Sequence, residues 1–311
     1  MVAVTVLGAG VWGSSLARLA TVAGQEVTVW SRRGSLALET AIAQAEVMVS
    51  AISMKGVADL AQQVSQLPLR ENTIVVTATK GLDPATTQTP SHIWQQALPH
   101  HPIVVLSGPN LSKEIDQDLP AATVAACTNP AAAETIQTIF SSSTFRVYTN
   151  TDPIGTELGG TLKNVIAIAV GVCDGLQLGT NAKSALITRA MTEVIRVGTT
   201  LGGRPETFMG LSGLGDLLAT CSSALSRNYQ VGFGLAQGES LDDILTHLQG
   251  TAEGVNTANV LIDVAQREKI LIPISYTVYQ LLNGQITAKE AIALLMERDL
   301  KPEALDLNSQ P

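Results

Sequence analysis

Short apolar runs alternate with amphipathic stretches through the first half of the chain. The apolar runs predict β-strands at Val2–Leu7, Glu26–Trp30, Glu46–Ala51, Thr73–Ala78, Ile103–Leu106, Ala121–Ala126 and Phe145–Thr149. Helical periods between them predict α-helices at Trp12–Ala23, Lys55–Leu67, Ser91–Leu98 and Pro130–Phe140. This alternation is typical of a parallel sheet with crossover helices, which is a doubly wound α/β fold.

The pattern changes after Asp152-Pro153, where long helical periods follow one another with no clear strand among them. They predict helices at Ile154–Val172, Ala182–Leu201, Gly254–Glu268, Pro273–Leu282 and Thr287–Met296. We therefore expect two domains, an α/β domain at residues 1–152 and an all-helical domain at residues 153–311.

Composition narrows the range of partners. The 311 residues are 45% hydrophobic but only 4% aromatic, so both cores must be built mainly from Ala, Val, Leu and Ile. The formal net charge is −8 and no long basic run is present, which excludes a protein whose main partner is nucleic acid. Three distant cysteines provide neither a disulfide framework nor a zinc site, and we predict no metal centre.

The sequence also bears on the compartment. No signal peptide is predicted, because the apolar N-terminal stretch lacks a basic region and runs into glycines. The most apolar stretch, Leu162–Val172, is too short to span a membrane. We expect a soluble, cytoplasmic protein without stable membrane insertion.

A glycine-rich turn, Gly8-Ala9-Gly10-Val11-Trp12-Gly13, follows the first predicted strand and opens the first predicted helix. In this G-x-G-x-x-G pattern Gly8 permits the tight turn, Gly10 lets the backbone approach a pyrophosphate, and Gly13 allows close helix–strand contact. The phosphates would bind the free N–H groups at the helix N-terminus. The pattern predicts a Rossmann domain that binds a dinucleotide; a purely structural glycine turn is the alternative.

Two arginines, Arg32 and Arg33, follow the second predicted strand, where NAD-specific sites often carry an acid. A guanidinium pair can bind a 2′-phosphate through bidentate hydrogen bonds. We therefore predict that NADP(H) is preferred and that NAD(H) is also accepted. The alternative is a pair of solvated loop arginines.

Two lysines are candidates for catalysis, because hydride reduction of a ketone needs a proton donor and a cation near the oxygen. Lys80 lies just past the fourth predicted strand, at the sheet edge where ligands bind. Lys163 lies in the apolar stretch Leu162–Val172, where an ammonium is costly unless it is paired or used. Gly159 and Gly160, one turn earlier, would leave space for a ligand. The plainer alternatives are an exposed loop position for Lys80 and a stem that reaches solvent for Lys163.

Polar groups in the second half complete the candidate site. Asp216 follows a glycine-rich stretch at residues 210–215, and it could pair with Lys163 or serve as a helix N-cap. Ser226-Arg227-Asn228 offers a hydroxyl, a guanidinium and an amide within one turn, a combination that suits a phosphate monoester. A polar helix start would look the same.

Taken in order, these segments resemble the bacterial-type NAD(P)-dependent glycerol-3-phosphate dehydrogenases over nearly the whole chain. The motifs that carry the resemblance are Gly8–Gly13, Thr79-Lys80-Gly81, Ser107-Gly108-Pro109, Glu157–Ile166, Lys183–Arg189, Gly213–Asp216, Leu225–Asn228 and Glu253-Gly254. The resemblance implies a Rossmann domain followed by a helical domain of the 6-phosphogluconate dehydrogenase type. It implies interconversion of dihydroxyacetone phosphate and sn-glycerol 3-phosphate, a supply of the latter for glycerophospholipid synthesis, and it allows a homodimer.

The resemblance also assigns roles to individual residues. It makes Lys163 the catalytic residue, which transfers the proton. Substrate contacts fall on Lys80, Gly108, Asn110, Lys163, Asp216, Ser226, Arg227 and Asn228. Cofactor contacts fall on Gly8, Gly10, Val11, Trp12, Gly13, Arg32, Arg33, Lys80, Ser112, Arg227, Thr251 and Glu253.

Two departures from the family pattern stand out. Asn110 replaces the serine that usually follows Gly108-Pro109. The stretch from Arg33 to Glu46 is short, which predicts that a helix and a strand are missing or reduced at the edge of the sheet. Two other functions stay open: a hydroxy-acid dehydrogenase of the same architecture, since an arginine also binds a carboxylate, and a non-catalytic sensor of dinucleotide redox state.

Overall fold

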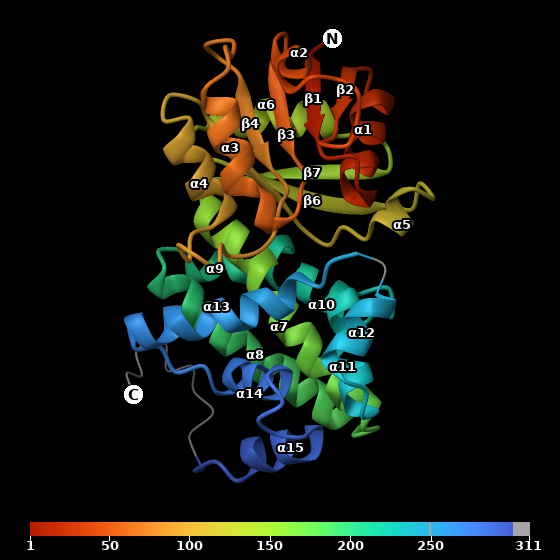
Figure 1. Ribbon diagram of the computed structural model, residues 1–311, viewed down its shortest axis with the longest axis vertical. Helices are drawn as coiled ribbons and strands as arrows, with labels where there is room; N and C mark the ends of the chain where they lie inside the picture. The colour runs from red at the N-terminus through yellow and green to blue at the C-terminus, as the bar shows by residue number, and fades with distance from the viewer. Residues whose placement is uncertain (249, 301–311) are drawn as a thin grey trace. The chain divides into compact units, whose positions relative to one another are not determined.

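The computed structural model describes residues 1–248 and 250–300, which form two compact units (Figure 1). The first unit comprises Met1–Asp83 and Gln88–Glu157. The second comprises Pro84–Thr87 and the described residues from Leu158 onward. The chain therefore enters the second unit briefly, shortly after Lys80, before it returns to the first.

The first unit is built on a seven-stranded sheet in the order β2-β1-β3-β4-β5-β6-β7. The strands are β1 (Ala3–Leu7), β2 (Glu26–Trp30), β3 (Val47–Ser50), β4 (Ile74–Thr77), β5 (Ile103–Ser107), β6 (Ala121–Ala126) and β7 (Phe145–Asn150). All seven predicted strands are present. The first five strands in this order, from β2 to β5, run parallel to one another. Strand β6 is antiparallel to β5, and β7 is parallel to β6. The expectation of a parallel sheet is therefore wrong for β6 and β7. An antiparallel neighbour needs no full crossover helix, and only one short helical turn separates β5 from β6.

Helices cover both faces of this sheet, as the predicted doubly wound fold requires. They are α1 (Val11–Val22), α2 (Leu38–Ile42), α3 (Val57–Ser65), α4 (Pro90–Ala97), α5 (Ser112–Ile115) and α6 (Pro130–Phe140). On one face Leu16 of α1 and Phe140 of α6 pack with Val49, and on the other Trp94 of α4 packs with Met48. Because neighbouring strand residues point to opposite faces and both faces are covered, the strands appear in the sequence as unbroken apolar runs.

The connection between β2 and β3 is short, as the sequence predicted. It holds only the five-residue helix α2, and residues 31–46 form no strand. A hydrogen bond of 2.7 Å from Thr5 Oγ1 to Ala41 O fixes α2 against β1. A Rossmann sheet usually continues with a further strand beyond this point, whereas here β2 is the edge strand.

Helices make up the second unit, and its described residues form no strand. They are α7 (Pro153–Gly175, which begins in the first unit), α8 (Gly179–Thr200), α9 (Pro205–Phe208), α10 (Asp216–Cys221), α11 (Arg227–Ala236), α12 (Leu241–His247), α13 (Glu253–Glu268), α14 (Pro273–Leu282) and α15 (Ala288–Met296). The five long predicted helices are present. Helices α9 to α12 were not predicted, because α9, α10 and α12 have only four to seven residues and α11 contains Gly232 and Gly234.

Helix α7 is 23 residues long, and its apolar window has a mean hydropathy of 1.2, so by length and composition it could cross a membrane. The stretch Leu162–Val172 is too short by itself, but the helix that contains it extends beyond the stretch at both ends. However, 89% of the window is buried inside the protein. Burial of this extent is what the central helix of a packed domain requires.

Glycines let α7 and α11 cross at very short distance. A Cβ on Gly232 would lie 1.9 Å from Ile168 O, and a Cβ on Gly171 would lie 2.1 Å from Tyr229 O. Real atoms cannot approach so closely, so no other residue fits at either position without separating the helices. The crossing holds the first turn of α11 against the backbone of α7.

Candidate active site

The glycine-rich turn after β1 has the three properties that dinucleotide binding requires. Gly8 has a φ of +122°, and a Cβ there would lie 2.6 Å from Ala51 O. A Cβ on Gly13 would lie 1.9 Å from Gly8 O, whereas a Cβ on Gly10 would meet nothing within 4 Å. Gly10 is thus the open position. Helix α1 begins at Val11 with no side-chain cap and no acid in its first turn, so its first N–H groups are available to an anion.

The two arginines lie in an exposed turn beside this glycine-rich turn. Gly8 N donates a 2.8 Å hydrogen bond to Trp30 O, which joins the glycine-rich turn to the end of β2. Residues 31–34 then form a turn closed by a backbone hydrogen bond of 2.9 Å. Arg32 and Arg33 are exposed, and within the described part of the chain neither forms an ion pair. Both guanidinium groups are therefore available to a phosphate.

Lys80 and the Gly108 loop lie together at the end of β4 and β5. Lys80 Nζ is 3.4 Å from Gly108 O, and a Cβ on Gly108 would lie 2.9 Å from Thr123 Cα. The side chain of Asn110 donates to Ala122 O at 3.1 Å and accepts from Thr123 Oγ1 at 2.9 Å. The asparagine that departs from the family pattern thus fastens this loop to β6, which leaves one amide hydrogen for a ligand.

Ser112 opens the short helix α5, which is fastened to α1. Ser15 Oγ donates to Asp116 Oδ1 at 2.8 Å, and Arg18 Nη1 donates to Asp118 Oδ1 at 2.9 Å. The structure therefore brings Ser112 to the helix that follows the glycine-rich turn.

Lys163 is the central cation of the second unit. It lies on α7 with 7% of its surface exposed, and its Nζ lies 2.5 Å from Asp216 Oδ1 and 2.5 Å from Thr220 Oγ1. The pairing with Asp216 that the sequence suggested is present, and the N-cap of α10 is Gly215 instead. Thr220 was missed. Its signal is its position one turn after Asp216, which can be recognised only if α10 is predicted.

A π-helical turn, Leu211–Gly215, delivers Asp216 to Lys163. A Cβ on Gly213 would lie 2.0 Å from Phe208 O, and a Cβ on Gly159 would lie 2.8 Å from Ser212 O. The expectation that Gly159 leaves space for a ligand is therefore wrong, because the backbone of this turn fills that space. Short π-helical segments occur frequently at functional sites.

The polar turn at residues 226–228 begins α11. Ser226 is the N-cap, and its hydroxyl accepts from Tyr229 N at 3.2 Å. Arg227 is exposed, and its guanidinium lies against Gly250, where a Cβ would be 2.3 Å from Nη1. Gly250 has a φ of +102° and precedes Thr251 at the approach to α13. The loop that carries Thr251 thus lies beside Arg227.

Asn228 links the same turn to the start of α13. Its Oδ1 accepts a hydrogen bond of 2.9 Å from Gly254 N, the second residue of that helix. Glu253, the first residue of α13, is half-buried. The structure therefore brings together five predicted residues of the second unit: Ser226, Arg227, Asn228, Thr251 and Glu253.

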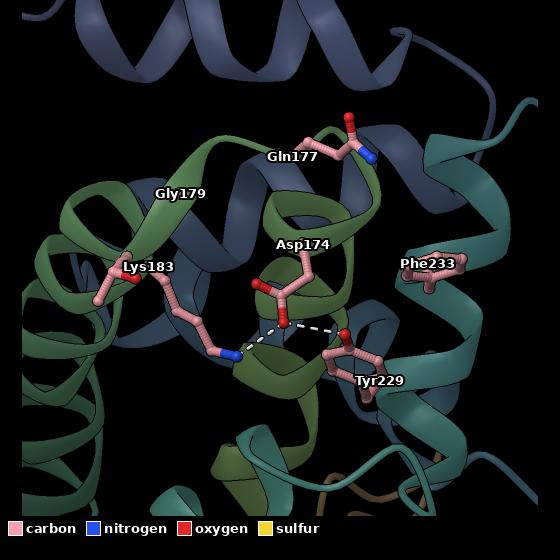
Figure 2. A pocket seen from close by; sticks show the side chains of 7 residues that line it. Asp174, Gln177, Gly179, Lys183, Tyr229 and Phe233 are labelled. Carbon is pink, nitrogen blue, oxygen red and sulfur yellow. Dashed lines mark hydrogen bonds and ion pairs between the residues drawn. The ribbon is translucent and has the colours of Figure 1, made fainter.

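A separate open hollow of about 600 Å³ lies at the other end of α7 (Figure 2). There Asp174 Oδ2 accepts from Lys183 Nζ at 2.6 Å and from Tyr229 Oη at 2.9 Å. Burial, followed by the bond to Asp174, raises the pKa of Tyr229 to about 12. Asp174 lies about 16 Å along the helix from Lys163, at 1.5 Å per residue, and no predicted site residue lines the hollow.

Two buried carboxylates missed by sequence reasoning bind helix N-termini. Glu157 accepts from Ser91 N at 2.9 Å, at the start of α4, and also from Ser91 Oγ. Glu193 accepts from Ile274 N at 2.6 Å and from Ser275 N at 3.1 Å, at the start of α14. Burial raises the pKa of each carboxyl group to about 7, although these hydrogen bonds act in the opposite direction. The partners in these hydrogen bonds are not predicted site residues.

The cysteines are buried free thiols. Burial raises the pKa of Cys221 to about 12 and also raises the pKa values of Cys127 and Cys173. A thiol with a raised pKa is a poor nucleophile at neutral pH. Residues 1–248 and 250–300 contain no group of three or more His, Cys, Asp or Glu side chains that could hold a metal ion.

Comparison with known families covers nearly the whole chain. The C-terminal model of the NAD-dependent glycerol-3-phosphate dehydrogenase family matches residues 152–293. The N-terminal model of that family matches residues 3–39 and 33–133, and these two segments overlap in the short connection between β2 and β3, where α2 begins.

Individual relatives indicate the same family as these models. A protein of Acaryochloris marina named glycerol-3-phosphate dehydrogenase [NAD(P)+] is 67% identical over 98% of both chains, and one of Synechocystis is 64% identical over 98% of this chain and 96% of its own. A solved glycerol-3-phosphate dehydrogenase of Coxiella burnetii superposes with a TM-score of 0.91 at 30% identity, over 96% of this chain and 99% of its own. The chain belongs to the NAD-dependent glycerol-3-phosphate dehydrogenase family.

Proposed function

We propose that this chain catalyses the NAD(P)H-dependent interconversion of dihydroxyacetone phosphate and sn-glycerol 3-phosphate. The observation that carries the proposal is the buried ammonium of Lys163, which contacts Asp216 and Thr220 at 2.5 Å each. Membership of the family supports it. The fold alone does not choose the substrate, since a ketopantoate reductase of Ralstonia eutropha shares it with a TM-score of 0.59 at 12% identity.

The first unit has the residues to hold the cofactor. The space above Gly10 and the uncapped start of α1 fit a pyrophosphate. Arg32 and Arg33 would bind a 2′-phosphate, so NADP(H) is preferred and NAD(H) is accepted. The remaining cofactor contacts in the proposal are Gly8, Val11, Trp12, Gly13, Lys80, Ser112, Arg227, Thr251 and Glu253. When bound, the reduced nicotinamide supplies the hydride that adds to C2 of the ketone.

The substrate is held through its charged and polar ends. Arg227 and Asn228 donate to the phosphate, and the hydroxyl of Ser226 donates its hydrogen while its oxygen serves as the N-cap of α11. Lys80, together with the loop at Gly108 and Asn110, binds the substrate oxygens. These contacts select a phosphate ester over an uncharged ketone.

Lys163 handles the proton. In the reducing direction its Nζ would give a proton to the oxygen at C2, and this proton balances the hydride that the bound cofactor would supply to the carbon, so the product is a secondary alcohol. In the oxidising direction the neutral amine removes the same proton. Asp216 and Thr220 hold Nζ in place through their hydrogen bonds.

The test is a spectrophotometric assay of the purified protein with a panel of ketones, using NADPH and NADH in turn. The proposal expects oxidation of the cofactor with dihydroxyacetone phosphate and a much lower kcat/KM with dihydroxyacetone and with 2-oxo acids. Faster reduction of a 2-oxo acid would assign a hydroxy-acid dehydrogenase instead. Cofactor binding without oxidation by any ketone would indicate a sensor.

The broader setting is part of the same proposal. The product supplies glycerophospholipid synthesis in the cytoplasm, and the enzyme acts as a homodimer. Residues 1–152 bind the cofactor, and residues 153–311 carry the catalytic lysine and the phosphate-binding turn. Residues 301–311 of that range lie outside the described residues.

A further inference from the structure

The turn at residues 226–228 contains one side-chain amide, that of Asn228, whose oxygen and nitrogen have different surroundings in the fold. Asn228 is 8% exposed, and its Oδ1 accepts the hydrogen bond from Gly254 N. A backbone N–H can only donate, so the side-chain atom that faces it must be the oxygen. The amide therefore has a single orientation.

Gly254 is glycine because of packing and not because of an unusual backbone angle. A Cβ on this residue would lie 2.6 Å from Asn164 O and 2.8 Å from Asn228 Oδ1. The contact with Asn164 is to the backbone of α7, which cannot rotate away. Any side chain would therefore move the start of α13 and lengthen its hydrogen bond to Asn228.

The other end of the amide is left for a ligand. Asn228 Nδ2 forms no hydrogen bond with the described part of the chain, and it lies in the first turn of α11 beside Arg227. An amide nitrogen with two hydrogens donates and cannot accept. The oxygen that could have repelled an anion is already used.

We propose that Gly254 is a positioning residue, whose N–H holds Asn228 so that the turn presents only donors to the substrate phosphate. This inference rests on the proposed function, since it concerns the site assigned to the phosphate there. It predicts that a carboxamide is required at position 228. An aspartate would keep the bond to Gly254 but would turn an acceptor with a negative charge toward the phosphate.

The first experiment replaces Asn228 by aspartate, which has nearly the same shape. Asn228→Asp is expected to fold with an unchanged thermal midpoint, because a carboxylate is favourable in the first turn of a helix. Its KM for dihydroxyacetone phosphate is expected to rise by about 10²-fold, the cost of a lost hydrogen bond to a charged group plus charge repulsion. A variant that uses the phosphate substrate as well as wild type does would overturn the proposal.

A double-mutant cycle tests whether Gly254 acts through Asn228. Gly254→Ala is expected to raise the KM for dihydroxyacetone phosphate about tenfold in the wild-type protein but less than about twofold in Asn228→Ala, because the two residues form one unit. Gly234→Ala is the matched control, since its Cβ would meet the side chain of Ile244 at 2.8 Å and not the Asn228 contact. Additive effects of Gly254→Ala and Asn228→Ala would overturn the positioning role.

A binding measurement separates this inference from the proposed reaction. Inorganic phosphate is expected to raise the thermal midpoint of the wild-type protein and of Gly234→Ala, and not that of Asn228→Asp. This result supports the inference even if no ketone is reduced, in which case only the proposed function fails. Equal stabilisation of wild type and Asn228→Asp, or no stabilisation of either, overturns the inference.

Discussion

The ammonium of Lys163 and the carboxylate of Asp216 are almost completely removed from water, with side chains 9% and 2% exposed. Removing two charges from water costs about as much as their attraction returns, so such a pair adds little net stability. Removing only one partner costs about 3–5 kcal/mol, because it leaves the other charge buried and unpaired. At the scale of single residues, the pair is therefore better explained by chemistry than by folding.

Replacement of this lysine by an uncharged side chain of similar length should abolish proton transfer. Lys163→Met is expected to lower kcat by about 10²–10⁴-fold, while the affinity for NADPH, measured by fluorescence titration, stays the same. The double variant Lys163→Met/Asp216→Asn is the control, since it removes the unpaired charge and restores stability but not activity. Turnover near the wild-type rate in both variants would contradict the catalytic role.

The two arginines after β2 should decide the choice of cofactor. Arg32→Ser/Arg33→Ser is expected to raise the KM for NADPH by about 10–100-fold, the equivalent of one lost hydrogen bond between charged groups, and to leave the KM for NADH nearly unchanged. Arg146→Ser on β7, at the opposite edge of the sheet, removes one positive charge far from this turn and should affect neither value. Equal KM values for the two cofactors in the wild-type protein would refute the preference for NADPH.

At the scale of elements, buried side chains fix where helices begin. Glu193 of α8 binds the first N–H groups of α14, and burial raises its pKa from 4.5 to about 7. Between these values the folded protein binds more protons at this group than the unfolded chain does. The contribution of Glu193 to the free energy of unfolding is therefore highest below pH 4.5 and is lost as the pH rises to 7.

The comparison with Glu193→Gln isolates this effect, because glutamine does not titrate. The free energy of unfolding of wild type minus that of Glu193→Gln is expected to fall by about 3 kcal/mol between pH 4.5 and 7, at about 1.4 kcal/mol per pKa unit, and to be constant at higher pH. Urea unfolding at a series of pH values measures it. A difference that does not change with pH would show that the pKa of the buried carboxyl group is not raised, and a difference that rises with pH would show that it is lowered.

The crossing of α7 and α11 provides a second test at this scale. Gly232→Ala is expected to lower the free energy of unfolding by about 1–3 kcal/mol and to reduce kcat/KM, because a Cβ 1.9 Å from Ile168 O must separate the helices and shift the phosphate-binding turn. Gly234→Ala on the same helix meets side chains and not backbone, Ile244 at 2.8 Å and Glu239 Oε1 at 3.2 Å, and should therefore cost less stability. Equal stability of the two variants in urea would contradict the close crossing.

The sequence was sufficient to predict those strands and helices that bury a continuous apolar surface. The seven strands and the five long helices carry such surfaces, so their periodicity identified them. The sequence did not indicate that β6 runs antiparallel to β5. The apolar pattern of a strand is the same whether a short loop or a crossover helix precedes it. Helices α9 to α12 were missed because tertiary contacts, such as the one between Gly213 and Phe208, decide where they begin.

The residues of the candidate site also fall into two groups, those that the sequence reveals and those that only the structure reveals. The glycine turn and Lys163 were recognisable, because glycines at fixed spacing and a charge in an apolar helix are anomalies in any sequence. Thr220 and Glu193 were not, since a threonine or a glutamate in a helical period has no unusual feature until its partner is known. The contacts that select their partners are long-range, and the spacing of residues in the chain does not encode them.

At the scale of the whole molecule, α7 is a single helix that serves both units. Its first turns provide Glu157 to the start of α4, and its later turns provide Lys163 to Asp216. A helix is cooperative along its length, so we expect both units to unfold in one transition.

The distribution of aromatic residues makes this testable. Trp12, Trp30 and Trp94 all lie in the first unit, whereas the described part of the second unit is helical and dominates the circular dichroism signal. Tryptophan fluorescence and circular dichroism are expected to give the same midpoint on heating. Saturation with NADPH at about 100 times its Kd should stabilise the folded state by about 2.7 kcal/mol and raise both midpoints together. Separate transitions would mean that α7 breaks between the units.

The short link between β2 and β3 has a consequence for solubility. Without a further strand beyond it, β2 ends the sheet with backbone groups that no other strand in the described residues satisfies. An exposed edge strand can pair with strands of other molecules and so start aggregation. Natural proteins prevent this pairing with charged side chains near the edge. Arg32 and Arg33 lie two and three residues after the end of β2. Their removal would therefore expose this edge to self-association as well as alter the nucleotide that is bound.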